Sequence, residues 1–252
     1  MSEQAPKRLN KYISDTGLCS RREADKLIEQ NRVTVNNQPP ELGTKVGPGD
    51  TVKVDGKVVG AVASDKSDRV YIVYNKPIGI TCTTERHVKG NIIDAIGHKE
   101  RIFPVGRLDK PSEGLIILTS DGDIVNKILR AENAHDKEYE VTVNQPISER
   151  FVNRMSRGVP ILGTVTKPCV VKPTGKNTFT IILTQGLNRQ IRRMCEFLGY
   201  EVTKLKRTRI MHLELGSLKP VQWRNLTSRE LAIMQNAVRS STKTASKVEL
   251  RK

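Results

Sequence analysis

The sequence predicts an α+β protein, with a small N-terminal module and a larger domain built on a mixed, mostly antiparallel sheet with flanking helices. Segments of strand type and of helix type follow one another in mixed order, and many are joined by hairpin-like turns, which favours α+β over a doubly wound α/β fold. A small, polar stretch at residues 56–69 is typical of a linker between the two parts. With 252 residues, the chain can bury a core in both parts.

The N-terminal module, residues 7–55, has the pattern of two helices followed by two strands. Apolar residues at helical spacing start at Leu9, and Gly17 ends this first helix because glycine adopts left-handed geometry without strain. Ser20 is the expected N-cap of the second helix, and Glu23, three residues later, completes a capping box. The strands are expected in the alternating segments RVTVNN and DTVKVDG, with a turn in KVGPGD between them.

The larger domain is expected at residues 70–238, where strand-like segments alternate with helical ones. Its strands are expected within RVYIVYNKPIG, EGLIILTSDGD, KEYEVTVNQPI, TFTIILTQG and KLKRTRIMHLEL. Helices are expected at residues 122–130, 148–156, 188–198 and 227–238. The last residues, 239–252, form a basic tail rich in Ser, Thr and Lys, which we expect to be disordered.

The charge of the chain points to a polyanionic partner. It has 43 Lys and Arg residues against 27 Asp and Glu residues, a formal net charge of +16, and such a surplus is the electrostatic footprint of nucleic-acid binding. A basic surface that serves only solubility is the alternative. No apolar run approaches the roughly 20 residues that a membrane helix needs, and the segment MSEQAPKRLNKY lacks the apolar core of a secretion signal. We therefore expect a cytoplasmic protein without membrane contact.

Cysteine and histidine spacing disfavours a metal site. The four cysteines are far apart, and no pair has the CxxC spacing of a zinc site. The four histidines form no HExxH or similar cluster, and the chain has no GxxxxGK[ST] phosphate-binding loop. We expect reduced thiols, no metal and no cofactor.

A first cluster of basic residues lies in the N-terminal module. Arg21 and Arg22 stand at a helix N-terminus, where backbone N–H groups add to the attraction for phosphate. The alternative is a solvated helix with charge pairs at helical spacing, since acidic residues partly cancel the cluster. The candidate nucleic-acid contacts of this module are Arg8, Lys11, Arg21, Arg22 and Arg32.

A second basic cluster follows the segment QGLN. Arg189, Arg192 and Arg193 are expected to enter a helix and to share one of its faces at i, i+3, i+4 spacing. Apolar residues of the same segment can pack on the opposite face. A solvated face is again the alternative, but few acidic residues oppose these arginines.

The order of residues in the N-terminal module is specific. The segment RLNKYISDTGLCSRREADKLIEQNRVTVNN resembles the S4 RNA-binding domain over about fifty residues. One departure is Asn31, where many S4 domains have glycine, but asparagine tolerates the same backbone geometry. The resemblance implies docking on structured RNA through its shape and its phosphates.

Asp109 is an acidic residue in a basic neighbourhood. It lies in GRLDKPSEG, beside Arg107 and Lys110, in a loop before an apolar run of strand type. Pro111, Ser112 and the glycines around it are typical of turns, so a carboxylate that only caps the loop is one interpretation. The other is a reactive group in a site that holds nucleic acid.

Motifs elsewhere in the chain favour the second interpretation. In combination, NKPIGITCT, GRLDKPSEGLIILTSDGD, KEYEV and QGLNRQIRRM resemble the RNA pseudouridine synthases that carry an N-terminal S4 domain, the RsuA family. Within it, RTRIMHLELG, GVPILGTVTK and LRAENAHDKEYEVTV resemble the F type, which acts on large-subunit (23S) ribosomal RNA. The resemblance runs from about Arg8 to Leu231, nearly the whole chain.

This resemblance implies roles for residues of the larger domain. Asp109 would be the catalytic aspartate, and Arg192 would form an ion pair with it. Tyr139 would lie against the target base and take part in proton removal. The substrate-binding residues would be Arg107, which fills the space left by the flipped uridine, Leu183 beneath the base, Lys76 in the pocket wall, and Arg189 and Arg193. Without the resemblance, Tyr139 and Leu183 would pass for core residues and NKPIG for a turn.

The chemistry of the implied reaction agrees with the composition. Isomerising uridine to pseudouridine conserves every atom, so it needs no redox cofactor, metal or ATP. It does need a carboxylate that stays ionised, and a nearby arginine opposes the effect of burial because its planar fork binds both carboxylate oxygens. A base inside a helix is inaccessible, so we expect base flipping at a cost of a few kcal/mol, with an aromatic ring that holds the free uracil by stacking.

Three functions remain open at this point. The first is an isomerase, acting as a monomer on structured RNA, with 23S ribosomal RNA as the substrate and a transfer RNA anticodon stem-loop as a second one that the resemblance suggests. The second is a non-catalytic RNA-binding or ribosome-assembly protein, which would gain nothing from an acid in its RNA cleft. The third is a DNA-binding regulator, for which the sequence has no clear helix-turn-helix.

Overall fold

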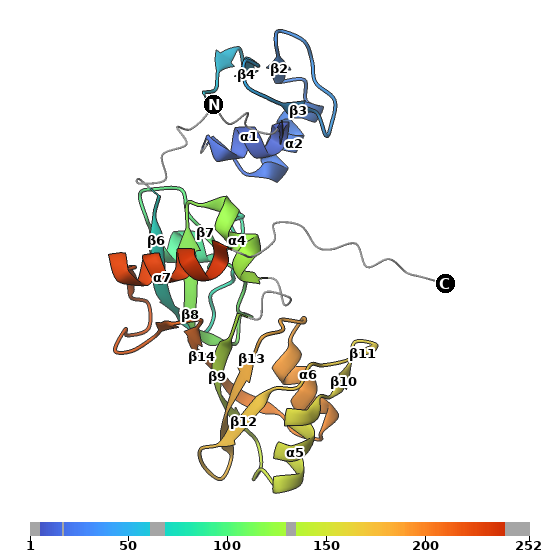
Figure 1. Ribbon diagram of the computed structural model, residues 1–252, viewed down its shortest axis with the longest axis vertical. Coiled ribbons are helices and arrows are strands. Elements are labelled where there is room, and N and C mark those ends of the chain that lie inside the picture. The colour runs from blue at the N-terminus through green and yellow to red at the C-terminus, as the bar shows by residue number, and fades with distance from the viewer. Residues whose placement is uncertain (1–5, 17, 61–68, 130–134, 240–252) are drawn as a thin grey trace. The chain divides into compact units, whose positions relative to one another are not determined.

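The computed structural model describes residues 6–16, 18–60, 69–129 and 135–239 (Figure 1). The chain divides into two compact units, Met1–Asp68 and Arg69–Lys252, which we call the N-terminal unit and the C-terminal unit. Among the described residues, one cluster of buried apolar side chains lies in the N-terminal unit and three lie in the C-terminal unit. The expectations for Gly17 and for residues 240–252 fall outside the described part of the chain.

The N-terminal unit packs two helices on short strands. In α2 (Arg21–Glu29), the N-cap Ser20 accepts a hydrogen bond on Oγ from the Glu23 N–H at 3.1 Å, and the Glu23 carboxylate accepts one from the Ser20 N–H at 2.6 Å. The predicted capping box is therefore confirmed. The other elements are α1 (Leu9–Asp15), β1 (Lys7–Arg8), β2 (Val33–Val35), β3 (Lys45–Val46), β4 (Val52–Val54) and β5 (Lys57–Val58).

Strand pairing in this unit goes beyond the two strands that the sequence predicts. β2, β4 and β5 form one antiparallel sheet, and β1 pairs with β3 in another. β3 takes up the first two residues of KVGPGD, where the sequence predicts a turn, and β5 lies inside the stretch that it predicts as a linker. An alternating pattern needs about four residues to be recognised, so strands of two residues leave no such signal.

Asn31 forms the turn between α2 and β2. Its φ of 56° lies in the left-handed region, which asparagine reaches more easily than most residues do. This departure from the S4 pattern is therefore compatible with the turn that glycine would otherwise make.

The C-terminal unit is built on a nine-stranded sheet with the order β12-β13-β9-β14-β8-β6-β16, to which β15 and β7 pair off this path. Neighbours are antiparallel except β14 and β8, which are parallel, so the predicted mixed, mostly antiparallel sheet is confirmed. Its strands are β6 (Tyr71–Lys76), β7 (Phe103–Pro104), β8 (Glu113–Thr119), β9 (Lys137–Val143), β12 (Val170–Pro173), β13 (Thr178–Leu183), β14 (Val202–Ile210), β15 (Leu213–Glu214) and β16 (Trp223–Asn225). A separate hairpin pairs β10 (Pro160–Ile161) with β11 (Thr164–Val165).

The helices of this unit lie largely where the sequence predicts them. The four that were expected are α4 (Gly122–Leu129), α5 (Glu149–Arg157), α6 (Gln190–Phe197) and α7 (Ser228–Arg239). α3 (Ile92–Ile96) is not predicted, because five residues are too few to display a helical period. Its start is nevertheless marked by Asn91, whose Oδ1 accepts a hydrogen bond from the Asp94 N–H at 2.8 Å.

β8 is an inner strand that faces a different core on each side. Leu115 and Ile117 pack with α4 and α7 on one face of the sheet (Figure 1). Ile116 and Leu118 pack on the opposite face with α3 and with Leu108. A strand that is buried on both faces has a nearly continuous apolar sequence, which explains the run EGLIILT.

The third core fixes the other half of the sheet. β9 and β13 pack there against α5 and α6, and Phe179, Met155 and Met194 are fully buried between them. The helix that carries Arg192 is thus held on the same half of the sheet as Tyr139. The loop that carries Asp109 instead precedes β8 on the other half, so the predicted site residues come from both halves.

Candidate active site

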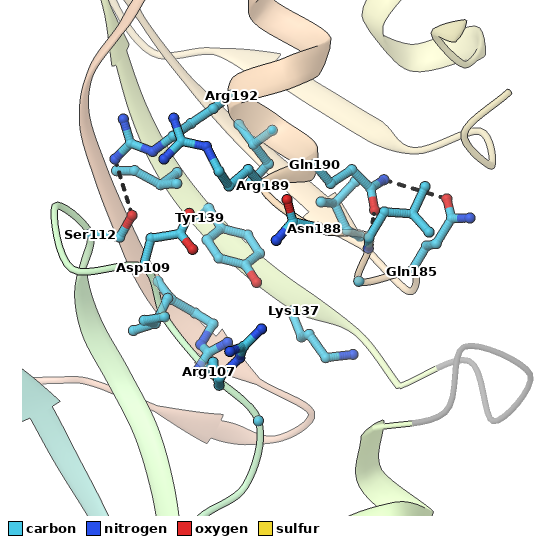
Figure 2. Close-up of a pocket in the computed structure, with 18 of the residues that line it drawn as sticks. Arg107, Asp109, Ser112, Lys137, Tyr139, Gln185, Asn188, Arg189, Gln190 and Arg192 are labelled. Atoms are coloured by element: carbon cyan, nitrogen blue, oxygen red, sulfur yellow. Dashed lines mark hydrogen bonds between the residues drawn. The ribbon is translucent and has the colours of Figure 1, made fainter. Parts of the chain in front are cut away.

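A pocket of about 460 Å³ in the described part of the C-terminal unit brings most of the predicted site residues together (Figure 2). Most of its lining comes from the loop 106–112 before β8, from the start of β9, and from the segment 183–192 that ends β13 and begins α6. Of the residues that the sequence predicts, it is lined by Arg107, Asp109, Tyr139, Leu183, Arg189 and Arg192.

Asp109 is carried by a loop with a buried anchor. Leu108 is buried in the core beside β8, and its N–H donates to Cys82 Sγ at 3.4 Å. The Ser112 N–H donates to the Asp109 carbonyl at 2.9 Å, which closes the turn. Within the described part of the chain, the half-buried Asp109 carboxylate has no hydrogen-bond or ion-pair partner. Figure 2 shows it directed towards the ring of Tyr139, so it is open to a ligand.

Arg192 is buried beside this loop and bonds to it. Its Nη2 donates to Ser112 Oγ at 3.1 Å and to the Pro111 carbonyl at 3.2 Å, while Nη1 donates to the Val202 carbonyl at 3.2 Å. Its Nε is buried without a partner. No ion pair joins Arg192 to Asp109 among the residues that the structure describes. The direct ion pair that the resemblance implies is therefore absent, because the guanidinium takes its acceptors from the loop and from the β14 backbone.

Charge still couples Asp109 and Arg192. Burial lowers the pKa of Arg192 most, the neighbouring charge of Arg189 lowers it further, and the charge of Asp109 raises it. Arginine remains protonated in proteins in spite of such shifts. Arg192 therefore acts on the carboxylate as a fixed positive charge rather than through a shared hydrogen bond.

The three arginines of the second cluster have different surroundings. Arg189 is the N-cap of α6, has a left-handed φ of 49°, and lies on the same side of the pocket as Arg192 (Figure 2). Arg193 does not line this pocket, and its Nε donates to the Asn188 carbonyl at 3.1 Å. The prediction of one shared helical face is wrong for Arg189, because the helix begins only at Gln190.

Tyr139 and Leu183 form an apolar wall of the pocket. Leu183 is buried at the end of β13, and Tyr139 packs between the cores on either side of it. Arg207 lies opposite Tyr139 in the register of β14 and β9, with its Cζ 5.9 Å from the centre of the ring. Figure 2 shows the Tyr139 hydroxyl pointing away from the Asp109 carboxylate, towards Lys137 and Arg107.

Lys137 and Arg207 also line the pocket, although the sequence analysis does not single them out as site residues. Lys137 is 6% exposed and Arg207 is 4% exposed, and residues of these types are rarely so buried. Arg207 Nε donates to the Leu115 carbonyl at 2.7 Å, while its Nη2 is buried without a partner. The spacing of Lys137 and Tyr139, two residues apart on a strand, was the available signal, because it places both on one face.

Lys76 does not line the pocket. It is fully buried, and its Nζ donates to the carbonyls of Pro77 and Ile80 at 2.9 Å each. Burial lowers the pKa of Lys76. Its charge therefore holds together the loop that follows β6, whereas the exposed Arg107 lies in the lining itself.

The predicted RNA contacts of the N-terminal unit differ in their surroundings. Lys11 Nζ donates to both carboxylate oxygens of Asp15 at 3.2 and 2.9 Å. Arg32 makes a bidentate pair with Asp55, at 2.8 Å from Nε and 2.6 Å from Nη2. The exposed residues Arg8, Arg21 and Arg22 complete the predicted set, the last two in the first turn of α2.

Two kinds of feature are absent from the described ranges, 6–16, 18–60, 69–129 and 135–239. They hold no group of three or more His, Cys, Asp or Glu side chains placed to bind a metal ion. They also include no helix with the length and the apolar content that crossing a membrane requires.

Two protein families match the sequence. The S4 domain matches residues 7–52, and the RNA pseudouridylate synthase family matches residues 70–197. The second match spans the loop of Asp109, the strand of Tyr139 and the helix of Arg192. It therefore covers the whole pocket lining except the two residues that β14 contributes.

Individual proteins agree with this assignment. The dual-specificity RNA pseudouridine synthase RluF of Salmonella typhi is 54% identical over 94% of this chain and 82% of its own length. The ribosomal large subunit pseudouridine synthase B of Bacillus subtilis is 34% identical over 89% of this chain and 93% of its own. A crystal structure of a pseudouridylate synthase superposes with a TM-score of 0.66 at 25% identity, over 90% of this chain and 99% of that one. The chain therefore belongs to the RNA pseudouridylate synthase family, and it is an isomerase with an N-terminal S4 domain.

Proposed function

We propose that this isomerase converts uridine to pseudouridine in large-subunit (23S) ribosomal RNA and also acts on a transfer RNA anticodon stem-loop. The observation that carries the proposal is the open Asp109 carboxylate, which faces Tyr139 in a pocket lined by arginines. The names of two relatives support the choice of RNA, since one is a dual-specificity enzyme and the other a ribosomal large-subunit enzyme.

Asp109 is the catalytic carboxylate of this proposal. The reaction breaks the bond between C1′ and N1, turns the uracil, and joins its C5 to C1′. In each version of this chemistry, whether the carboxylate adds to the substrate or removes a sugar proton, it acts in its ionised form. Arg192 and Arg189 place fixed positive charges in the same pocket as this carboxylate.

Tyr139, Leu183 and Arg107 hold the nucleotide in place. The Tyr139 ring stacks on the uracil while it is detached from the sugar, and Leu183 closes the pocket beneath the base. Arg107 occupies the space that the flipped nucleotide leaves in the RNA, which offsets part of the few kcal/mol that flipping costs. Lys76 supports this wall through the loop that it holds.

The N-terminal unit docks on folded RNA as S4 domains do. Contacts of this kind follow the shape of the RNA and its phosphates and carry little sequence information. The net charge of +16 favours them through counterion release. The contacts come from Arg8, Lys11, Arg21, Arg22 and Arg32, and Arg193 adds one beside the pocket.

The organisation of the chain follows from these roles. We propose an S4 domain at residues 7–55, a linker at 56–69, a catalytic domain at 70–238 and a basic tail at 239–252. One chain holds both the docking and the catalytic residues, so we expect it to work as a monomer. We expect it in the cytoplasm, where its RNA substrates are.

The substitution Asp109→Asn tests the proposal. It removes the charge at nearly constant shape, so we expect pseudouridine formation to fall below detection in 23S ribosomal RNA and in a transfer RNA stem-loop, with RNA binding retained. Pseudouridine is measured by carbodiimide treatment followed by primer extension. The exposed carboxylate of Glu214, changed to Gln, is the matched control. Undiminished modification by the Asp109 variant would contradict the catalytic assignment, and a wild-type enzyme inactive on both RNAs would contradict the choice of substrate.

A further inference from the structure

The β10–β11 hairpin turns through a leucine in a strained conformation. Ile161 pairs with Thr164, so the loop between the strands consists of Leu162 and Gly163 alone. Both have a positive φ, 51° and 71°, as a type I′ turn requires of its two central residues. Asparagine and glycine favour this geometry, whereas the Cβ of leucine is crowded by the backbone there. Leucine at position 162 therefore lowers the stability of the turn.

The hairpin is firmly held at its base and exposed at its tip. Val159 and Ile161 are buried in the core that also contains residues of α5 and α6. The Val159 N–H donates to Thr166 Oγ1 at 2.9 Å, and the Thr166 N–H donates to the Val159 carbonyl at 3.1 Å. Leu162, in contrast, is 53% exposed. Burial within the fold therefore does little to offset the strain of this residue.

The hairpin adjoins the pocket of Asp109. Figure 1 shows β10 and β11 beside α6, whose first residues line the pocket. After β11, the Lys167 N–H donates at 3.0 Å to the side-chain oxygen of Gln185, which also lines the pocket. Leu162 lies five residues before Lys167, so even a fully extended chain would place it at most about 18 Å from this bond. An RNA strand with its target nucleotide in the pocket can therefore reach the tip with a neighbouring nucleotide.

The charge around the hairpin indicates the kind of partner. Residues 150–195, which include the hairpin and the pocket segment 183–192, contain nine Lys and Arg residues and no Asp or Glu. Arg157 and Lys167, which flank the hairpin in the sequence, are both exposed. A surface of this kind repels a second copy of itself and attracts a polyanion. RNA is therefore the occupant that the charge favours.

An apolar side chain has one kind of target on RNA. The phosphates are charged and the sugar edges are polar, so the apolar surfaces of RNA are the faces of its bases. Within a helix, neighbouring bases cover these faces, but a base in a loop or bulge, or beside a flipped nucleotide, exposes one. Leucine is among the apolar wedges that proteins insert against unstacked bases in DNA. A turn that is already rigid loses little conformational entropy when it makes such a contact.

We propose that the β10–β11 hairpin contacts the substrate RNA and that Leu162 packs on the face of an unstacked base near the target uridine. This inference deepens the proposed function and rests on it. The contact buries the exposed half of the leucine side chain, which offsets in the complex the strain that the free protein bears. Leu162 takes no part in the chemical step, so it acts on the binding and positioning of the RNA.

The substitution Leu162→Asn tests this role because asparagine fits the turn but lacks the apolar side chain. Relief of the strain should raise the Tm of the C-terminal unit by about 2–4 °C. On a fragment of 23S ribosomal RNA, kcat/KM should fall about 5- to 10-fold, the loss expected when half of a leucine is no longer buried. We expect this loss to appear in KM rather than in kcat. A residue with only a structural role would not gain stability while losing affinity for RNA.

Further variants separate strain from contact. Leu162→Ala keeps a strained residue but removes most of the apolar side chain, so kcat/KM should fall as for asparagine without a rise in Tm. Leu162→Met keeps an apolar side chain of similar volume and should retain kcat/KM within about twofold. Ile233 on α7 is a similarly exposed apolar residue, at 43%. Its substitution Ile233→Gln is the matched control and should leave kcat/KM unchanged.

Substrates that lack single bases identify the partner of Leu162. We would assay a series of RNA fragments in which one nucleotide at a time, around the target uridine, carries no base. With the wild type, one of these fragments should show the same loss of kcat/KM that Leu162→Asn causes. That loss should be absent in the Leu162→Asn variant, because both changes remove the same contact. Equal losses in the two proteins at every position would overturn the contact.

The outcomes distinguish this inference from the proposed function. A wild-type protein that forms no pseudouridine in either RNA would overturn the function and the contact together. Normal pseudouridine formation with unchanged kcat/KM in Leu162→Asn and Leu162→Ala would overturn the contact alone. A dimer that light scattering detects in the wild type but not in Leu162→Asn would assign the tip to a second copy of the chain and would overturn the contact as well.

Discussion

Two groups of positive side chains, one buried in the C-terminal unit and one at the surface of the N-terminal unit, have different partners. In the C-terminal unit, Lys76, Lys137, Arg192 and Arg207 are at most 8% exposed, and their hydrogen bonds go to backbone carbonyls and to the Ser112 hydroxyl, not to carboxylates. In the N-terminal unit, the predicted RNA contacts are exposed or paired with a carboxylate.

The buried cations are held in one orientation, whereas the exposed cations are surrounded by water. A carbonyl orients a buried cation without neutralising it, so its field remains directed at whatever enters the pocket. An exposed cation is screened by salt and by water, which suits contacts that must form with many phosphates and break again. We therefore expect the same residue types to serve chemistry in the C-terminal unit and docking in the N-terminal unit.

Gly114→Ala is expected to have the largest effect, because it displaces the strand that carries a buried cation. Gly114 pairs with Arg207 across the parallel strands, and a Cβ at this position would overlap the Arg207 carbonyl oxygen and lie 2.6 Å from its nitrogen. Its φ of 109° is also strained for any other residue. Overpacking and strain together should lower the free energy of unfolding by about 2–5 kcal/mol. The fluorescence of Trp223, the only tryptophan in the chain, reports on urea unfolding of this unit.

Gly199→Ala is the matched control for backbone strain. Gly199 has a φ of 82°, and nothing lies within 4 Å of the Cβ that alanine would add. Only the strain of the left-handed backbone should then lower the free energy of unfolding, by about 1–2 kcal/mol. Equal losses in the two variants would mean that the close approach of β8 and β14 does not matter for stability.

Ser112→Ala is expected to have an intermediate effect, because it removes one acceptor that orients Arg192. Ser112 is 1% exposed, so water cannot easily take the place of its Oγ. Loss of a buried hydrogen bond to a charged group costs about 1–3 kcal/mol, which corresponds to roughly 5–150-fold if all of it falls on the transition state. We expect kcat to fall within that range in steady-state assays on the ribosomal RNA substrate.

Ser112→Thr shows whether Ser112 acts by orienting Arg192 through its hydroxyl or only by filling space. Threonine keeps a hydroxyl at the same position and adds a methyl group to a tight site. We expect most of kcat to return while the urea midpoint falls slightly. If the threonine variant is as slow as the alanine variant although it is folded, Ser112 does not act through its hydroxyl.

The sequence predicts most of the regular elements because their patterns are long enough. The capping box of α2 and the apolar run of β8 follow from local chemistry and from burial on two faces. α3 and the strands of two residues are missed because they are too short for their pattern to repeat. The pocket loop is located through the motif around Asp109, not through periodicity.

The remaining features of the site depend on long-range packing. Lys137 and Arg207 are rare buried cations, and residue type alone predicts that such side chains are exposed. The absence of a direct bond between Asp109 and Arg192 depends on carbonyl groups that the fold brings to Arg192 from residues 81 and 10 positions away. The spacing of residues along the sequence does not show that these carbonyl groups take the place of Asp109 as acceptors for Arg192.

The smallest expected effects concern the exposed cations of the N-terminal unit. Each phosphate contact contributes about 0.7–0.9 to the slope of log K against log salt concentration. Replacing Arg21 and Arg22, both exposed at the start of α2, with alanine should therefore make the slope shallower by about 1–2. RNA binding is measured by fluorescence anisotropy over a series of salt concentrations.

Arg32→Ala provides the contrast within the same unit. The Arg32 guanidinium is already bonded to both oxygens of Asp55, so fewer of its donors are available to a phosphate. We expect Arg32→Ala to change the slope of log K against log salt concentration by less than about half of the contribution of one phosphate contact. A change as large for Arg32→Ala as for Arg21→Ala alone would mean that pairing with Asp55 does not withdraw Arg32 from docking. An unchanged slope in the double variant would instead remove the start of α2 from the RNA contact surface.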